Sequence, residues 1–104
     1  MKIKNEKREN VLGNLSPVNI QQLKQSETQS DEKIGSLIRY FRKQNGMTQT
    51  QLAVVAGISP QQIQKYEKGS DRIAFSRLIT LLDFLQIELD DFMKEMKLSG
   101  EKQA

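Results

Sequence analysis

Residues 48–69 read TQTQLAVVAGISPQQIQKYEKG, and this stretch carries the start signals of two short helices. Thr48 with Gln51, and Ser59 with Gln62, have the spacing of a capping box. In that motif a hydroxyl accepts a hydrogen bond from the amide three residues later, and the Gln side chain returns to the capping residue's own amide. Two such starts so close together predict two consecutive helices with a short connection.

The residues between these starts predict a tight turn. Pro60 suits the first position of a helix, where its missing N–H costs nothing. Gly57 can take the positive φ that commonly ends a helix. We therefore expect helices at about 49–56 and 60–68, joined as a helix-turn-helix. This motif places its second helix in the major groove of DNA.

The flanking sequence predicts three more helices and no strands. A helix beginning near Asp31 and Glu32 would place both acids where they complement the helix dipole. Apolar residues at helical spacing follow in it and in two later segments, at 75–85 and 88–97, so the expected class is an all-α bundle of five helices. The apolar stripe of the first helix consists of Ile34, Leu37, Ile38 and Phe41.

The composition divides the chain into three parts. Residues 1–30 are polar with few large apolar residues, which predicts a flexible N-terminal tail. Residues 31–98 form the expected DNA-binding domain, with the helix-turn-helix at about 48–68, and residues 99–104 form a C-terminal tail.

The residue types absent from the chain argue against an enzyme. It has neither cysteine nor histidine, so thiolate and imidazole metal sites are excluded. We find no phosphate-binding glycine loop and no paired acids in a cleft-forming context, and we expect no catalytic residues, no metal and no cofactor. No apolar run approaches the roughly 20 residues that span a membrane, and the start lacks a secretory pattern. We expect a cytoplasmic protein.

Charge is distributed unevenly along the chain, whose net charge is +3. Residues 31–77 hold eight basic against four acidic residues, a surplus of +4, whereas residues 78–104 hold three against six, which gives −3. The positive half contains the helix-turn-helix, as expected for a surface that binds phosphate.

The segment Ile34 to Phe92 resembles the phage repressor/Cro-type (XRE-like) helix-turn-helix regulators, which have a lambda-repressor-like fold. The resemblance covers somewhat over half of the chain and is carried by IGSLIRYFRKQNGMTQ, QLAVVAGIS and QQIQKYEKG. It implies that Gln49 grips the DNA backbone. It also implies an internal ion pair between Arg42 and Glu67, which we interpret as structural.

The second helix of the motif has a polar face suited to reading bases. At 100° per residue, Ile63 and Glu67 fall on one side, and a set rich in Gln and Lys falls on the other. Gln can bond bidentately to adenine and Lys to guanine. Gln62 lies on the flank, where it is either a capping partner or free for a base. The predicted base-contacting residues are Gln61, Gln62, Gln64 and Lys65.

A second group is predicted to contact phosphates, which positions a protein on DNA without conveying sequence. The start of the helix at 49–56 offers free amides and a positive dipole. The loop after residue 68 and the end of the first helix add cations. The predicted phosphate-contacting residues are Thr48, Gln49, Ser59, Lys43, Lys68, Ser70 and Arg72.

Dimerisation is expected because helix-turn-helix proteins usually bind two half-sites. The segment 75–85 is apolar on nearly all sides, more than one core readily uses. Either the surplus apolar residues complete the monomer core, or they form a two-fold interface. The predicted interface consists of Phe84, Ile87, Phe92 and Met96.

The sequence-based hypothesis is a regulator that binds double-stranded DNA in a sequence-specific way, and acts as a dimeric repressor on an inverted-repeat operator. The alternative is an antitoxin-type protein, which combines operator binding with an N-terminal tail, residues 1–30, that binds a protein partner such as a toxin.

Overall fold

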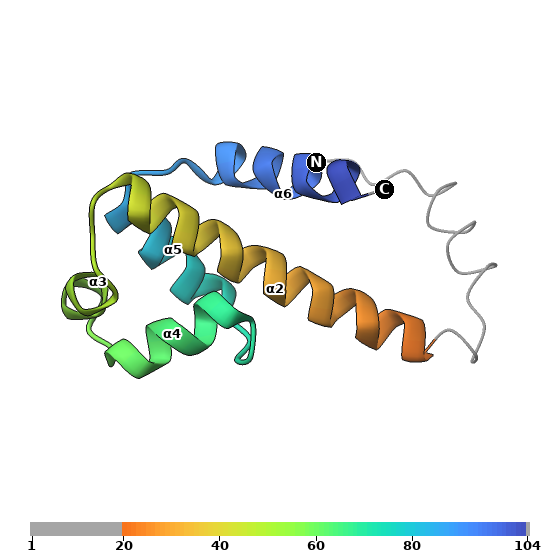
Figure 1. Cartoon of the computed structure of the whole chain (residues 1–104), viewed down its shortest axis with the longest axis horizontal. Coiled ribbons are helices and arrows are strands. Elements are labelled where there is room, and N and C mark those ends of the chain that lie inside the picture. Colours follow the sequence, from red (N-terminus) through yellow and green to blue (C-terminus); the bar gives the residue numbers. More distant parts are fainter. Residues whose placement is uncertain (1–19, 104) are drawn as a thin grey trace.

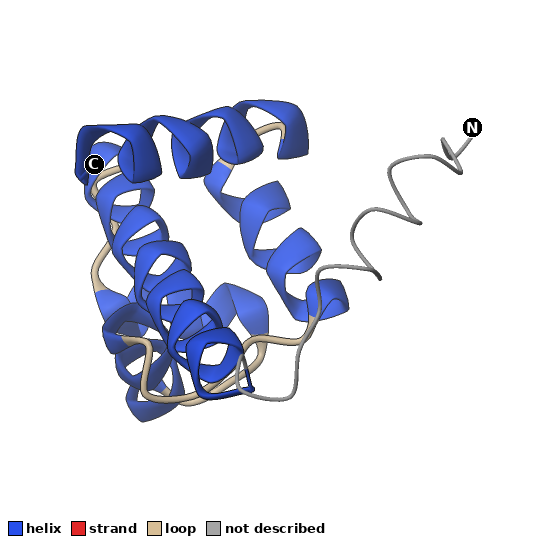
Figure 2. Ribbon diagram, turned by 90° about the vertical axis from the view of Figure 1, so that its right-hand side faces the viewer, coloured by secondary structure: helices blue, strands red, loops and turns tan. Residues whose placement is uncertain are grey.

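The computed structural model describes the backbone of residues 20–103 and the side chains of residues 21–98. All of its regular structure is helical (Figures 1 and 2), which confirms the predicted all-α class for this part of the chain. The five helices are α2 (Ile20–Gln44), α3 (Gln49–Ala56), α4 (Pro60–Lys68), α5 (Phe75–Leu85) and α6 (Leu89–Gln103).

The first described helix is longer than expected. α2 begins at Ile20, not near Asp31, so residues 20–30 of the predicted flexible tail are helical, and residues 1–19 lie outside the described residues. Residues 20–33 contain no Gly or Pro and several good helix formers, so nothing in them stops the helix. Figure 1 shows the start of α2 projecting beyond the other helices.

The turn between α3 and α4 forms as its residues predict. The Thr48 hydroxyl accepts a hydrogen bond from the Gln51 amide at 3.0 Å, and the Gln51 side chain accepts one from the Thr48 amide at 2.8 Å. Gly57 ends α3 with φ 71°, and the amide of Ile58 donates to the carbonyl of Ala53 at 3.1 Å. Both ends of α3 are therefore capped by nearby residues.

The second predicted capping box is only half formed. The Ser59 hydroxyl accepts from the Gln62 amide at 3.1 Å. The Gln62 side chain, however, donates to Asp71 at 3.0 Å and does not return to Ser59. A carboxylate acceptor makes a stronger hydrogen bond than a neutral one, and the loop after α4 brings Asp71 within reach.

One hydrophobic core joins all five helices. Among its buried residues, α5 contributes four, α3 two and each other helix one. Because every helix supplies part of the same core, the position of α4 depends on the whole bundle. The buried residues are Ile38, Leu52, Ala53, Ile63, Leu78, Leu81, Leu82, Leu85 and Phe92.

The core corrects the predicted dimer interface. Phe92 is only 1% exposed and lies 6.4 Å, ring centre to ring centre, from Phe41 of α2. It completes the monomer core because α6 packs against α2. Ile87 and Met96 are partly buried against the same core, whereas Phe84 is 43% exposed. Of the four predicted residues, Phe84 alone is classed as exposed.

The last helix also exceeds its expected bounds. The backbone of α6 continues past Lys97 to Gln103, through most of the predicted C-terminal tail. None of the described helices combines the length and the apolar character needed to cross a membrane.

We expect Ala74→Ser to stabilise the protein by about 1 kcal/mol. Ala74 is the N-cap residue of α5 and has extended backbone dihedrals, but no side chain caps the helix there. A Ser hydroxyl would accept one of the unpaired amides of the first turn. Urea denaturation of wild type, Ala74→Ser and Ala74→Val measures the effect. A gain shared by valine, which has no hydroxyl, would contradict a capping effect.

Candidate nucleic-acid interface

Helix α4 presents one polar face to solvent because its other face is anchored in the bundle. Ile63 is fully buried and Glu67 is 7% exposed. Gln61, Gln64 and Lys65 are exposed on the outer face and make no side-chain hydrogen bond or ion pair with any residue that the structure describes. Three of the four predicted base-contacting side chains are therefore available to a ligand.

The fourth, Gln62, is engaged within the protein. Its side-chain nitrogen Nε2 donates to Asp71 Oδ2 at 3.0 Å, and both residues are partly buried. This bond ties the start of α4 to the loop that follows its end. We therefore withdraw Gln62 from the predicted base-contacting set, because reading a base would require it to leave a charged partner.

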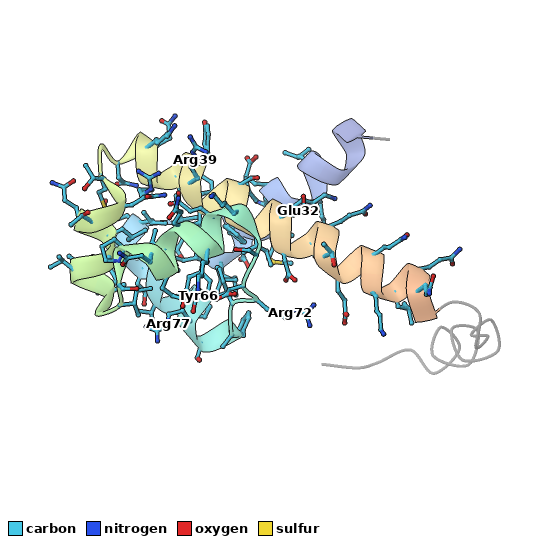
Figure 3. The ribbon with its side chains drawn as sticks, turned by 60° about the horizontal axis from the view of Figure 1, so that its bottom comes forward. Glu32, Arg39, Tyr66, Arg72 and Arg77 are labelled. Carbon is cyan, nitrogen blue, oxygen red and sulfur yellow. The ribbon has the colours of Figure 1, made fainter. Side chains whose placement is uncertain are left out.

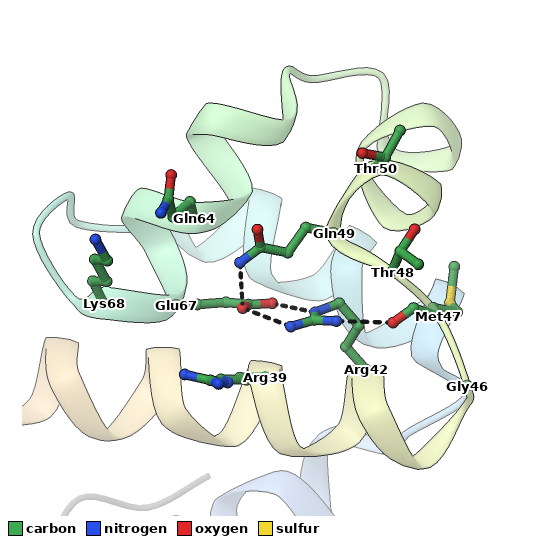
Figure 4. Close-up of a pocket in the computed structure, with 10 residues that line it drawn as sticks. All are labelled: Arg39, Arg42, Gly46, Met47, Thr48, Gln49, Thr50, Gln64, Glu67 and Lys68. Atoms are coloured by element: carbon green, nitrogen blue, oxygen red, sulfur yellow. Dashed lines mark hydrogen bonds and ion pairs between the residues drawn. The ribbon is translucent and has the colours of Figure 1, made fainter.

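The ion pair implied by the resemblance is present and buried (Figure 4). Arg42 Nε donates to Glu67 Oε2 at 2.6 Å and Arg42 Nη2 to Glu67 Oε1 at 3.0 Å. Arg42 also donates to the carbonyl of Met47 at 2.8 Å, and Gln49 Nε2 donates to Glu67 Oε1 at 3.0 Å. The network joins α2, the start of α3 and α4, so it sets the position of α4 relative to the helix before it.

The start of α3 retains donors that the capping box does not use. The amides of Thr48 and Gln51 are both paired within the box. The amides of Gln49 and Thr50 have no acceptor among the described residues. The first amides of a helix are suited to a phosphate oxygen. The Gln49 side chain uses one N–H on Glu67 and keeps its second.

The loop after α4 is held against α4 and α2 by polar contacts. The Ser70 hydroxyl donates to the carbonyl of Lys65 at 3.2 Å. Arg72 pairs with Asp31 at 3.2 Å and with Glu27 at 3.8 Å. Asp31 therefore lies inside α2 and pairs with a cation of the loop. The sequence had predicted that Asp31 stands at the start of the helix. Because Arg72 remains 63% exposed, solvent screens both of its pairs.

The structure separates the predicted phosphate-contacting residues into two groups. Thr48, Gln49 and Lys68 line one open hollow of about 640 Å³, between α2, α3 and α4. Figure 3 shows Arg72 well away from Arg39, which lines that hollow. The residues outside the hollow's lining are Lys43, Ser59, Ser70 and Arg72.

Sequence reasoning missed Arg39 as a site residue and counted it only toward the basic surplus. It lies on the exposed side of α2 and lines the same hollow as Lys68 and Gln64 of α4. Its position one turn before Arg42 was an available signal, because residues three apart share a helix face. The sequence alone did not show that this face lies against α4.

Comparison with known proteins agrees with this geometry. A family model described as helix-turn-helix matches residues 38–92, which is over half of the chain. The chain therefore belongs to the Cro/C1-type (XRE-like) helix-turn-helix family.

The relatives come from several bacteria. An uncharacterized HTH-type transcriptional regulator of Sinorhizobium medicae is 42% identical over 65 residues, which cover 62% of this chain and 47% of that protein. One from Sinorhizobium fredii is 34% identical over 77 residues, covering 74% and 54%. The chain thus spans about half the length of these curated relatives.

A solved structure shares the fold. The clp gene regulator ClgR from Corynebacterium glutamicum superimposes with a TM-score of 0.68 and 26% sequence identity. The match covers 71% of this chain and 79% of that one.

Proposed function

We infer that this chain is a transcriptional regulator that binds double-stranded DNA in a sequence-specific way, with α4 in the major groove. One observation carries the proposal: α4 is anchored by Ile63 and Glu67 while Gln61, Gln64 and Lys65 stay exposed and unpaired within the described structure. These side chains can bond to adenine and guanine edges. We further propose repression through a dimer on an inverted-repeat operator, since a bound dimer can block polymerase.

Selection from random double-stranded DNA, followed by sequencing of the bound pool, tests this function. We expect enrichment of an inverted repeat whose half-sites lie about one helical turn, roughly 34–36 Å, apart. A single enriched half-site would contradict the dimer and leave base reading intact. No enrichment, with only salt-sensitive binding to all sequences, would contradict sequence-specific recognition. Repression is then tested by placing the operator over a promoter and measuring its output with and without the protein.

We expect Lys65→Ala to reduce the ratio of specific to nonspecific affinity by about 1–3 kcal/mol, the range for one good base contact. Titrations of the selected operator and of a scrambled duplex at one salt concentration measure this ratio. Lys24→Ala is the matched control, because it removes the same charge from an exposed position near the start of α2. Equal losses on both duplexes would show that Lys65 contacts phosphate.

We expect Gln49→Ala to weaken binding to both duplexes alike, by about 1 kcal/mol for one lost hydrogen bond. Phosphate contacts do not distinguish sequences, so the affinity ratio should stay constant. Gln49 also donates to Glu67, so the variant's stability must be measured separately. Affinities compared at a temperature where both proteins are fully folded separate the two effects. A changed ratio would place Gln49 among the base readers.

The dimer proposal now depends on a smaller surface than the sequence predicted. Phe84 on α5 is 43% exposed, and Met93 on α6 is 47% exposed. Exposed apolar side chains mark a contact surface only where they form a contiguous patch, so the part of Phe84 in a dimer contact needs a direct test. Sedimentation of wild type and Phe84→Ser at matched concentrations tests the surface. We expect the substitution to shift the equilibrium toward monomer, and an unchanged equilibrium would exclude Phe84 from the interface.

An antitoxin-type protein remains the second candidate. The observation that favours it is the exposed start of α2, where residues 21–29 are all exposed and Leu23 is 53% exposed. A partner protein could bind this part of the helix. A selection without an enriched motif would favour a role in which the chain binds a protein partner through this segment.

A further inference from the structure

Arg39 is a cation without an internal role in the described structure. Its side chain is exposed and forms no ion pair or hydrogen bond with residues 21–98. Lys68, on α4, is likewise exposed and unpaired within these residues. Both side chains line the hollow, and Figure 4 shows Arg39 on α2 and Lys68 on the facing helix α4. Two free positive charges from separate helices thus border one space.

The charge of the hollow is positive once its internal pair is discounted. Its charged lining residues are Arg39, Arg42, Lys68 and Glu67. Arg42 and Glu67 neutralise each other through two short hydrogen bonds, so Arg39 and Lys68 supply a surplus of +2. Glu67 is the only carboxylate in this lining, and its own charge is already paired. The space therefore attracts anions.

The remaining walls identify which anion fits. Gln64, an exposed residue of the proposed base-reading face, lines the hollow together with Thr48 and Thr50. When α4 lies in the major groove of a duplex, the phosphates of the strands that border this groove lie beside α4. Hydroxyl and amide groups on this side can donate to phosphate oxygens. The hollow is open to solvent, so an extended polyanion can reach it without any loop moving.

We propose that Arg39 is a further phosphate-contacting residue, which acts together with Lys68 across the α2–α4 junction, so that the phosphate contacts already predicted for Thr48, Gln49 and Lys68 converge with it on one DNA backbone phosphate seated in this hollow. This inference rests on the proposed function, because the phosphate belongs to the duplex that α4 reads. It assigns a direct DNA contact to a residue of α2 that the predicted set did not contain. It also separates the predicted phosphate contacts at this seat from those outside it, which are Lys43, Ser59, Ser70 and Arg72.

The salt dependence of binding tests the seat without knowledge of the operator. The full chain is titrated, across a range of salt concentrations, against a random-sequence duplex of about 20 base pairs, which is about two helical turns and therefore long enough for one docked module. Each phosphate contact adds about 0.9 to the magnitude of the slope of log affinity against log salt. We expect Arg39→Gln to reduce this slope by about 0.9, and Arg39→Gln with Lys68→Gln to reduce it by about 1.8. Lys24→Gln, the control on the projecting part of α2, should leave the slope unchanged.

The outcomes separate the seat from the proposed function. Arg39→Gln and Lys24→Gln with equal slopes, on a wild type that binds DNA, would overturn the seat and leave the function standing. A wild type without salt-sensitive binding would overturn both. Because Arg39 has no partner in the described structure, Arg39→Gln should retain wild-type stability to within about 0.5 kcal/mol in urea. Reduced binding is then not a folding defect.

A substitution on the DNA side locates the phosphate. Once the operator is selected, its phosphates are replaced one at a time by neutral methylphosphonates. We expect one replacement beside the α4 half-site to weaken wild type and to have no further effect on Arg39→Gln, since the variant has already lost that contact. Equal losses in both proteins at every position would contradict the assignment of Arg39 to a single phosphate.

Discussion

Gly35→Ala is expected to destabilise the protein by about 3 kcal/mol, the upper range for overpacking. A Cβ at Gly35 would lie 2.2 Å from the carbonyl oxygen of Tyr66 and 2.6 Å from that of Glu67. Both neighbours are backbone atoms of α4, so no side chain can move aside. Alanine favours a helix over glycine by about 1 kcal/mol, but this gain is smaller than the cost of separating α2 from α4.

A substitution at the neighbouring position separates the effect of the close approach between α2 and α4 from a general effect of alanine in this helix. Ser36→Ala changes the next residue of α2, which is exposed, so it should alter stability by less than about 0.5 kcal/mol. Urea denaturation of the three proteins gives the free energies of unfolding. If Gly35→Ala were as stable as wild type, α2 and α4 would not approach as closely as the structure indicates. Any reduction of DNA affinity in this variant would follow from a displaced α4.

Arg42→Met is expected to cost about 3–5 kcal/mol, the usual cost of removing one member of a buried ion pair. The Glu67 side chain is only 3% exposed, so without Arg42 its charge has no solvent to compensate it. Gln49 alone would still donate to it, through one neutral amide. The carbonyl of Met47 would also lose its Arg42 donor. Thermal or urea denaturation measures the loss.

The chain contains a matched control for burial. Arg72→Met removes the same side chain from a pair with Asp31, but Arg72 is 63% exposed, so the expected cost is below about 1 kcal/mol. The double variant Arg42→Met with Glu67→Met removes both charges and should be more stable than Arg42→Met alone. If the Arg42 and Arg72 variants lost equal stability, burial would not determine the strength of this pair.

The helix-turn-helix was predictable because its signals are local. Thr48 and Gln51 are three residues apart, and their capping bonds form within one turn of helix. Gly57 ends α3 through its own backbone conformation. Neither feature needs a distant part of the chain, so residue types and spacing were sufficient. The outward face of α4 follows equally from helical periodicity once Ile63 is placed inside.

Predictions were less successful for residues whose role depends on a contact with another segment of the chain. The sequence placed Asp31 at a helix start, but it lies within α2 and pairs with Arg72, forty-one positions away. It offered Gln62 to a base, although Asp71 holds that side chain. It assigned Phe92 to a dimer interface, yet the residue fills the monomer core. In each case the residue type fitted two environments, and a distant segment decided between them.

By itself, the sequence determined the helices of the motif, their caps and the polar face of α4, because these depend on bonds and periodicities within a few residues. Tertiary structure alone decided that α2 meets α4 at Gly35, which lets their backbones approach closely. It also decided that Arg39 and Lys68 border one hollow. Such contacts arise when separate helices share one core, and no local pattern specifies which faces will meet.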